Sequence, residues 1–164
     1  MRLVQNEHRG TREIYRERLA PGLWMLVTIA LAGPMAALVF TPVGATIALI
    51  IGALVSLLLV TLSIIASPTV RVTETTLYAG RAHIDAHWLG EPQAFTGEEA
   101  MARRTRDIAR DGWHLIRGGI DGIVIVPIDD PDDPVSSWTI STRTPDRLLA
   151  AIMTARRSER PERP

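Results

Sequence analysis

ALVFTPVGATIAL, residues 37–49, decides the fold because it contains the one turn signal in a long tract without charged residues. The tract extends from Arg18 to Arg71. As a single straight helix it would be roughly 78 Å long, whereas the hydrocarbon core of a bilayer is about 30 Å thick. The sequence TPVG, residues 41–44, has the composition of a tight turn. We therefore predict a hairpin of two transmembrane helices, residues 23–40 and 44–66, with the turn at 41–43.

Arginines flank this tract on both sides, and none lies in its turn. Since basic residues in short flanks stay on the cytoplasmic side, we expect both termini in the cytoplasm of a multi-pass protein of a bacterial inner membrane. A cleaved signal peptide is the alternative, but the apolar block exceeds the usual h-region of about 7–15 residues. The flanking arginines are Arg2, Arg9, Arg12, Arg16 and Arg18 before the tract, and Arg71 and Arg81 after it.

Composition excludes several kinds of function. The formal net charge is zero, which gives no overall attraction to nucleic acid, and no nucleic-acid partner is expected. The absence of cysteine removes disulfides, thiolate metal sites and cysteine nucleophiles. Neither predicted span contains an ionisable residue, and proton or ion pathways need such groups, so transport by this chain alone is not expected.

The polar segment 1–21 precedes the first span. Tyr15 and Leu19 have the spacing of one helical face, and Pro21 would end that helix. We predict a short helix in the membrane interface, with Tyr15 and Trp24 as anchors at the level of the headgroups. A specific docking role for YRERL, residues 15–19, is the alternative.

The spans carry two packing signals. Pro34 lacks an N–H, which releases the carbonyl of Ala30 and predicts a kink. Small residues recur every fourth position in the second span and allow close approach of another helix. This stripe packs either within the hairpin or against another chain, which would be a protein partner or a second copy. The stripe consists of Gly44, Ala48, Gly52 and Ser56, faced by Thr28, Ala32 and Ala36.

The alternating, β-branched pattern of residues 67–156 predicts a cytoplasmic, mainly-β (α+β) domain, which we expect to be an antiparallel sheet or barrel of about six or seven strands. Thr96 and Glu99 form a capping box ahead of one helix. The C-terminal amphipathic helix, residues 145–156, has Thr144 as N-cap and an apolar face. Residues 157–164 are expected to be disordered. The strands are expected in TVRVTETTLYAG, RAHIDAHWLG, EPQAF, WHLI, DGIVIVPI and SSWTIST, and the apolar helix face contains Leu148, Leu149, Ile152 and Met153.

HIDAH, residues 83–87, is the most suggestive group for metal chemistry. On one strand His83, Asp85 and His87 would share a face about 7 Å apart, and two of them could bind a metal with a ligand from another strand. A solvated polar face explains the same alternation without a metal, and we predict no metal site and no cofactor.

Two further charged clusters have structural interpretations. DDPDDP, residues 129–134, lacks the ligand spacing and glycine of a calcium loop and reads as a rigid turn. ARRTRDIAR, residues 102–110, is either a solvated helix face or a contact with anionic headgroups. The arginines of this second cluster are Arg103, Arg104, Arg106 and Arg110. No phosphate-binding glycine motif, nucleophile elbow or HExxH motif occurs, and IRGGIDG, residues 116–122, reads as a hairpin between strands.

With these pieces together, the chain resembles a family of small actinobacterial two-pass membrane proteins classed as a domain of unknown function. The resemblance covers nearly all of residues 13–153, and it implies the two-pass topology but supplies no catalytic residue. The membrane hairpin followed by a sheet and a C-terminal helix is also similar to bacterial pleckstrin-homology-like (PH-like) domains. The matching pieces are YRERL, LYAGRAHI, DDPDDPVSSW and, most specifically, STRTPDRLLAAI.

Within STRTP we interpret Ser141, Thr142, Arg143 and Pro145 as a structural motif, in which Arg143 pairs with Asp146 or a DDPDDP carboxylate. The function expected is a non-catalytic interaction or scaffolding module that binds a protein partner or the membrane surface. An accessory subunit of a transport or envelope-synthesis complex, bound through the stripe, is the alternative. A metal-dependent enzyme using HIDAH is more distant.

Overall fold

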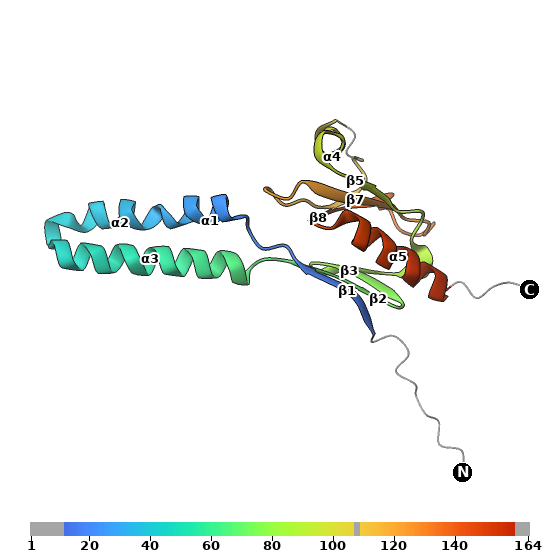
Figure 1. Cartoon of the computed structure of the whole chain (residues 1–164), viewed down its shortest axis with the longest axis horizontal. Coiled ribbons are helices and arrows are strands. Elements are labelled where there is room, and N and C mark those ends of the chain that lie inside the picture. Colours follow the sequence, from blue (N-terminus) through green and yellow to red (C-terminus); the bar gives the residue numbers. More distant parts are fainter. Residues whose placement is uncertain (1–11, 107–108, 160–164) are drawn as a thin grey trace, which may run out of the picture. The chain divides into compact units, whose positions relative to one another are not determined.

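The computed structural model describes residues 12–106 and 109–159, which form two compact units (Figure 1). The first unit, the hairpin, comprises Ala20–Ser67 with Arg117–Gly119, and the second, the β domain, contains the remaining described residues. The hairpin consists of α1 (Leu23–Ala30), α2 (Ala32–Phe40), the 3₁₀ turn η1 (Thr41–Val43) and α3 (Ala45–Ile65). The β domain consists of β1 (Glu13–Arg18), β2 (Thr69–Thr73), β3 (Thr76–Ala79), β4 (Ala82–Asp85), η2 (Ala86–Trp88), β5 (Gln93–Phe95), α4 (Gly97–Thr105), β6 (Trp113–Leu115), β7 (Gly122–Pro127), β8 (Ser137–Thr142) and α5 (Pro145–Glu159).

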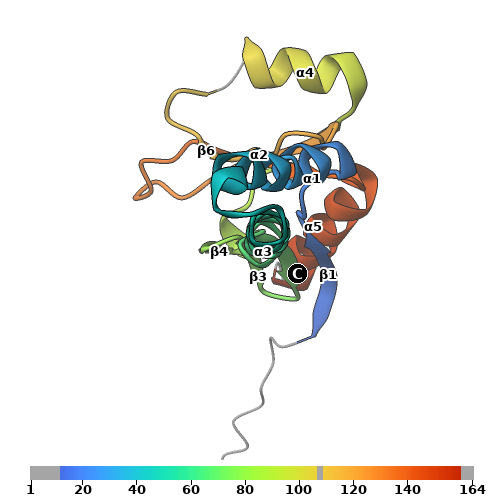
Figure 2. The ribbon, with the colours of Figure 1, turned by 90° about the vertical axis from the view of Figure 1, so that its left-hand side faces the viewer.

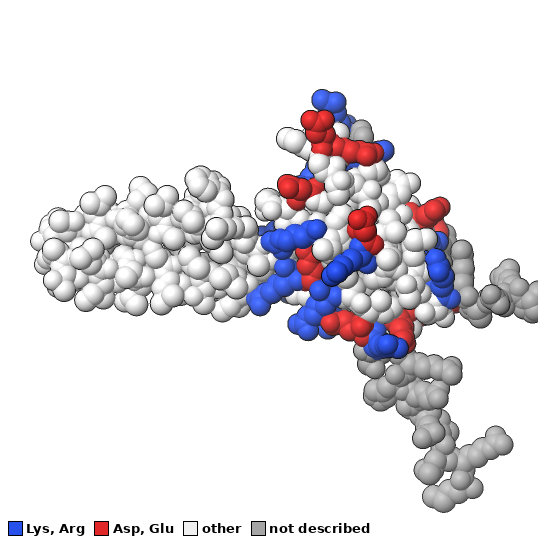
Figure 3. All heavy atoms as spheres, viewed as in Figure 1, with Lys and Arg blue, Asp and Glu red and all other residues white. Residues whose placement is uncertain are grey.

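The hairpin has two arms that lie side by side (Figures 1 and 2). Leu23–Val43 and Ala45–Ile65 are each 21 residues long, with mean hydropathies of 2.1 and 2.8, which is enough to cross a membrane by length and composition. The chain turns at Thr41–Val43, and the next residue, Gly44, has φ +143°, a conformation that glycine tolerates. No Lys, Arg, Asp or Glu lies on the visible face of these helices (Figure 3). The prediction of two long apolar helices joined at TPVG is confirmed.

The first arm is divided into α1 and α2 at Leu31, three residues before Pro34. Pro34 cannot donate a hydrogen bond to the carbonyl of Ala30, and Ser56 Oγ from α3 donates to that carbonyl instead, at 2.6 Å. An unpaired carbonyl would be costly in an apolar environment, so the proline and the serine form a matched pair across the hairpin.

Two glycines bring the arms into backbone contact. Gly33 of α2 and Gly52 of α3 are both buried. A Cβ added at Gly52 would lie 2.7 Å from the carbonyl oxygen of Gly33 and 2.9 Å from the Cβ of Ala37. A Cβ at Gly33 would collide with Ser56 Oγ and with the carbonyl oxygen of Gly52. Neither position therefore accepts a side chain without separating the arms.

Three residues of the small-residue stripe, Ala48, Gly52 and Ser56, thus pack within the hairpin. Ala48 and Gly52 are buried, Ser56 bonds across, and Gly44 lies at the turn. On the opposite arm, the residues in contact with Gly52 are Gly33 and Ala37 rather than the predicted ones. Thr28 is exposed and donates to the carbonyl of Trp24 at 3.0 Å, and Ala32 and Ala36 are half-buried.

We predict that Gly52→Leu destabilises the hairpin by about 1–3 kcal/mol, because the new side chain must displace the backbone of α2. The measurement is the melting midpoint in mild detergent, followed by recovery on size exclusion. Ala53→Leu is the matched control, since Ala53 is exposed on the same helix. Equal midpoints for the two variants would show that the arms do not pack as described.

The β domain contains two four-stranded sheets rather than one sheet or a closed barrel. The first sheet is antiparallel throughout and has the order β1-β2-β3-β4, and the second has the order β5-β7-β8-β6. Strand β6 pairs parallel with β8, which corrects the prediction of an entirely antiparallel sheet. Because β8 separates β6 from β7, IRGGIDG is a crossing between non-adjacent strands and the predicted hairpin is wrong.

Helix α5 supplies the core that joins the two sheets. It contacts β1 and β2 of the first sheet and β5 and β7 of the second (Figure 1). The C-terminal helix is confirmed but extends three residues further than predicted, so 157–159 are helical, and residues 160–164 lie outside the described residues. Its buried face contains Leu148, Ala151, Ile152 and Ala155, whereas Leu149 and Met153 are only half-buried.

The segment before the hairpin is a strand, which corrects the prediction of an interfacial helix; its first eleven residues lie outside the described part. β1 pairs antiparallel with β2, with Glu17 opposite Val70. The Tyr15–Leu19 spacing fits a helix, but Tyr15, Glu17 and Leu19 also share one face of a strand, and Leu19 is fully buried there. Pairing with the exposed edge of β2 is a tertiary contact that local spacing does not reveal.

The β domain is therefore discontinuous in sequence. The chain leaves it at Leu19 and returns at Pro68, and the N–H of Leu19 donates to the carbonyl of Pro68 at 2.9 Å. The predicted domain of residues 67–156 omits β1. A fragment that starts at Ser67 consequently lacks an edge strand and a buried leucine.

Candidate functional site

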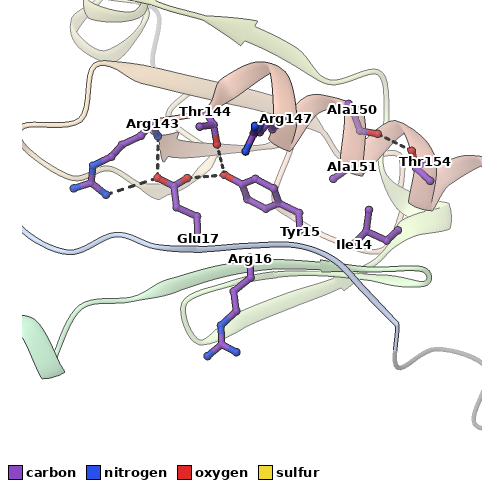
Figure 4. A pocket seen from close by; sticks show the side chains of 10 residues that line it. All are labelled: Ile14, Tyr15, Arg16, Glu17, Arg143, Thr144, Arg147, Ala150, Ala151 and Thr154. Carbon is purple, nitrogen blue, oxygen red and sulfur yellow. Dashed lines mark hydrogen bonds and ion pairs between the residues drawn. The ribbon is translucent and has the colours of Figure 1, made fainter.

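Two sequence motifs far apart in the chain meet in one polar cluster. Tyr15 and Glu17 come from YRERL on β1, and Thr142, Arg143 and Thr144 come from STRTP, where β8 leads into α5. The strand alternation directs Tyr15 and Glu17 toward α5 and Arg16 to the opposite side (Figure 4). We call these five residues, Tyr15, Glu17, Thr142, Arg143 and Thr144, the Glu17 cluster.

The carboxylate of Glu17 is the centre of the cluster. Its Oε2 accepts hydrogen bonds from Tyr15 Oη and Thr142 Oγ1, both at 2.6 Å. Its Oε1 accepts the backbone N–H of Arg143 at 3.0 Å, and the guanidinium of Arg143 lies 3.7 Å from the same oxygen (Figure 4). Bonds to an ionised acceptor are the stronger kind, and the Glu17 side chain is only 13% exposed. Glu17 therefore connects β1 to the start of α5.

These bonds determine which groups are donors and which are acceptors in the rest of the cluster. Since Tyr15 uses its single proton on Glu17, Thr144 Oγ1 must donate to Tyr15 Oη at 2.9 Å. Thr142 Oγ1 likewise gives its proton to Glu17 and accepts the N–H of Thr144 at 3.1 Å. Both hydroxyl protons are then used, so no donor remains for the 3.1 Å contact between Tyr15 Oη and Thr142 Oγ1.

STRTP also begins α5. The carbonyl of Thr144 accepts the N–H groups of Arg147 and Leu148, both at 3.1 Å, and Pro145 occupies the first helical position, where a missing N–H costs nothing. Ser141 and Thr142 are fully buried and Pro145 is buried, so three members of the predicted motif lie in the interior. Arg143 is the exposed member, and its partner is Glu17 rather than the predicted Asp146 or a DDPDDP carboxylate.

Burial raises the pKa of the Tyr15 phenol above its usual value, and the neighbouring Glu17 carboxylate raises it further. The hydroxyls of Thr142 and Thr144 act in the opposite direction and are outweighed. A phenolate beside a carboxylate in a half-buried site is unfavourable, so Tyr15 remains a neutral donor.

Beside the cluster lies an open groove of about 670 Å³ between β1 and one face of α5 (Figure 4). Strand β1 has one strand neighbour among the described residues and contributes four consecutive positions, so the groove follows the edge of the sheet. The helix side is formed largely by small residues. The lining residues are Ile14, Tyr15, Arg16, Glu17, Arg143, Thr144, Arg147, Ala150, Ala151 and Thr154.

The structure separates the histidines of HIDAH. Strand β4 ends at Asp85, so His87 lies in η2, where its N–H and Nδ1 approach Glu159 Oε2 at 3.1 and 3.2 Å. His83 stacks on Tyr78 with ring centroids 5.9 Å apart. The predicted common face of His83, Asp85 and His87 is therefore wrong. Across the described part of the chain, no group of three or more potential ligands could hold a metal ion.

The arginines of ARRTRDIAR do not form one surface either. Arg103 lies over the Phe95 ring, 4.9 Å from its centroid. Arg104 is half-buried and donates to the carbonyls of Ile120 and Gly122, and this burial lowers its pKa. Arg106 and Arg110 are exposed. Arg104 thus joins α4 to the start of β7 and is not available to headgroups.

The architecture defines a class of protein: a mainly-β domain interrupted by an apolar two-helix hairpin and closed by the Glu17 cluster. The chain belongs to the family described as Protein of unknown function (DUF3093), whose model matches residues 14–152. That match includes both motifs of the cluster and confirms the resemblance to a domain of unknown function. No curated protein and no solved structure matches the chain.

We predict that Glu17→Ala lowers the free energy of unfolding of the β domain by about 2–3 kcal/mol, because it leaves two hydroxyls and a backbone N–H without their acceptor. Arg143→Ala is the comparison, with a loss below about 1 kcal/mol, since its side chain is 42% exposed and its N–H remains bonded. Denaturant unfolding measures both, and an equal or reversed order would contradict the central role of Glu17.

A second prediction concerns the titration of Tyr15. The chain has two tyrosines, so Tyr78→Phe leaves Tyr15 as the single phenol, and phenolate absorbance should appear above pH 10. Adding Glu17→Gln should move the pKa back toward 10. Because the folded pKa is the higher one, the contribution of Tyr15 to stability is intact below about pH 10 and is lost as the pH rises further. Identical titrations with and without Glu17 would contradict the assignment.

Proposed function

We propose that this protein is a two-pass protein of an actinobacterial cell membrane that holds a non-catalytic, PH-like interaction domain at the cytoplasmic surface. The observation that carries the proposal is the insertion of the hairpin between two paired strands of the β domain. Both arms are long and apolar enough to span a membrane. Arginines flank the hairpin on both sides and are absent from its turn. These features support membrane insertion with both termini in the cytoplasm.

The groove between β1 and α5 is the proposed site for a protein partner. An edge strand offers unpaired main-chain groups to which an extended segment can add as a further strand. The small side chains of Ala150, Ala151 and Thr154 leave room beside that edge, and Arg143 and Arg147 favour acidic groups on the partner. The domain would act by positioning this partner at the membrane.

The alternative is an accessory subunit of a transport or envelope-synthesis complex, for which the small-residue stripe would be the contact. Gly52 and Ala48 are buried by the first arm, so they offer little surface to another chain. The exposed leucines of both arms remain for such a contact. A metal-dependent enzyme using HIDAH is the most distant alternative, since His87 is turned toward Glu159.

Single cysteines test the topology directly, because the natural chain has none. Val43→Cys at the turn should react with a membrane-impermeant maleimide in intact cells. Glu74→Cys and Ser158→Cys should react only after the membrane is permeabilised. Labelling of Glu74→Cys in intact cells would overturn the orientation, and release of the protein by alkaline washing would overturn the membrane anchor.

The groove is tested by filling it. Ala150→Trp places an indole in the groove, and Arg157→Trp places the same ring on an exposed part of α5 away from the groove lining. A partner captured with the full-length protein in mild detergent should be lost with Ala150→Trp and kept with Arg157→Trp. A partner that both variants retain would exclude the groove as its site.

A further inference from the structure

The outward face of the first sheet carries a continuous row of cationic and aromatic side chains. Across the four strands Arg16 lies opposite Arg71, Arg71 opposite Tyr78, and Tyr78 opposite His83. The guanidinium of Arg71 lies 4.9 Å from the centroid of the Tyr78 ring, and the Tyr78 and His83 rings stack. Arg16, Arg71 and His83 are exposed and Tyr78 is half-buried. At the alternate positions of β2 and β3, Val70, Val72 and Leu77 are fully buried, so the row points away from the core.

Charge is segregated along the strands of this face. Arg18 lies opposite Thr69, and Arg81 follows Gly80, whose N–H donates to the carbonyl of Thr69 at 2.9 Å. These two arginines therefore lie beyond the row, at the same end of the sheet. We call the set Arg16, Arg18, Arg71 and Arg81 the arginine end. The other end has three carboxylates and one arginine, Arg12, which directly precedes β1. Of the carboxylates, Glu13 lies opposite Thr73, Asp85 lies opposite Thr76, and Glu74 lies in the turn between β2 and β3.

The arginine end is also the end at which the chain leaves and re-enters the β domain. Leu19 and Pro68 are hydrogen-bonded beside it. Helix α1 begins at Leu23 and α3 ends at Ile65, so four and three residues separate the sheet from the two arms. At no more than about 3.6 Å per step from one Cα to the next, the five and four steps of these connections reach at most about 18 Å and about 14 Å. Both short connections to the hairpin thus start from the arginine end, and the carboxylates lie at the far ends of the strands.

We propose that the arginine end, together with Tyr78, docks on anionic phospholipid headgroups and holds the first sheet against the bilayer. This inference rests on the proposed membrane anchoring of the hairpin. Guanidinium groups bind phosphate through paired hydrogen bonds, and a tyrosine ring suits the interface between headgroups and acyl chains. Anionic lipid attracts the arginine end and repels the carboxylate end, so the charge pattern sets the orientation of the strands as well as the contact.

A lipid surface fits this face better than a nucleic acid does. The chain has no net charge, and the arginines form one short patch rather than a track along which a phosphate backbone could run. The Tyr78 ring is contacted both by Arg71 and by the stacked His83 ring, which leaves it little open surface on which a base could stack. The patch instead lies beside the tethers to the apolar hairpin.

The test uses the full-length protein in lipid nanodiscs, with spin labels on single cysteines. His83→Cys places a label in the row and leaves all four arginines in place, and Glu74→Cys places one at the carboxylate end. Collision with a water-soluble paramagnetic reagent measures exposure in phosphatidylcholine discs with and without phosphatidylglycerol. We expect anionic lipid to lower the accessibility of the first label several-fold, with no change at the second, and we expect added salt to reverse the effect.

Combined Arg16→Gln, Arg71→Gln and Arg81→Gln should abolish this protection. Arg106→Gln, Arg110→Gln and Arg157→Gln remove the same charge from exposed positions outside this face and should leave it intact. Unchanged melting of both triple variants confirms that they fold, and two single variants, Arg71→Gln and Arg81→Gln, replace the first triple variant if it does not fold. Equal accessibility of His83→Cys in both kinds of disc, or protection that survives loss of the arginines, would overturn the proposal.

The outcomes also separate this proposal from the one on which it rests. Protein that stays in neutral discs after an alkaline wash but does not respond to phosphatidylglycerol overturns the docking alone. Protein that leaves the discs overturns the membrane anchor and the docking with it. Protection of His83→Cys by a single-stranded oligonucleotide in neutral discs, without protection by phosphatidylglycerol, would assign the face to nucleic acid and overturn the lipid contact.

Discussion

The pairing of β1 with β2 is the interaction on which the rest of the structure depends. It joins two segments that the hairpin separates in sequence, and it ends in the Leu19–Pro68 hydrogen bond, where the chain leaves and re-enters the β domain. Without it the first sheet would lose an edge strand, the core would lose Leu19, and the groove beside α5 would lose one wall. The same pairing places the residue at which the chain leaves the β domain next to the residue at which it returns.

The Glu17 cluster adds a second connection to this pairing. β1 is an edge strand, and its main-chain bonds to β2 hold it on one side only. Glu17 connects β1 to the start of α5 by accepting hydrogen bonds from Thr142 and from the backbone N–H of Arg143. Because those donors stand at the start of α5, the strand, the second sheet and the core helix are fixed at one point. A carboxylate that is only 13% exposed and has three donors is a specific connection, since an apolar residue of similar size would leave those donors unpaired.

The sequence predicted the parts of this fold that depend on local chemistry. The uncharged tract, the TPVG turn, the break near Pro34, the strands of alternating pattern and the helix after Thr144 all follow from spacing and turn residues, and the structure contains each of them. The parts that it did not predict are long-range. Tyr15 and Leu19 suit a helix as well as a strand until β2 is present, and His87 leaves the strand because η2 begins at Ala86. The partner of Arg143 is more than a hundred residues away, across the hairpin. YRERL and STRTP both belong to the pieces of sequence that match the family, and this is the one sequence signal that the two motifs could lie together in the fold.

The insertion of the hairpin within a strand pair has a consequence for the order of folding. β1 is synthesised first, but its partner β2 follows only after both arms, so β1 has no strand to pair with while they are made. Closing a loop of that length as a flexible chain would cost entropy. A helical hairpin returns its two ends to the same place, so once the arms have packed the ends of β1 and β2 are already close together. Pairing of β1 with β2 thus follows the packing of the two arms, and a chain whose arms fail to meet leaves an open strand edge on its β domain.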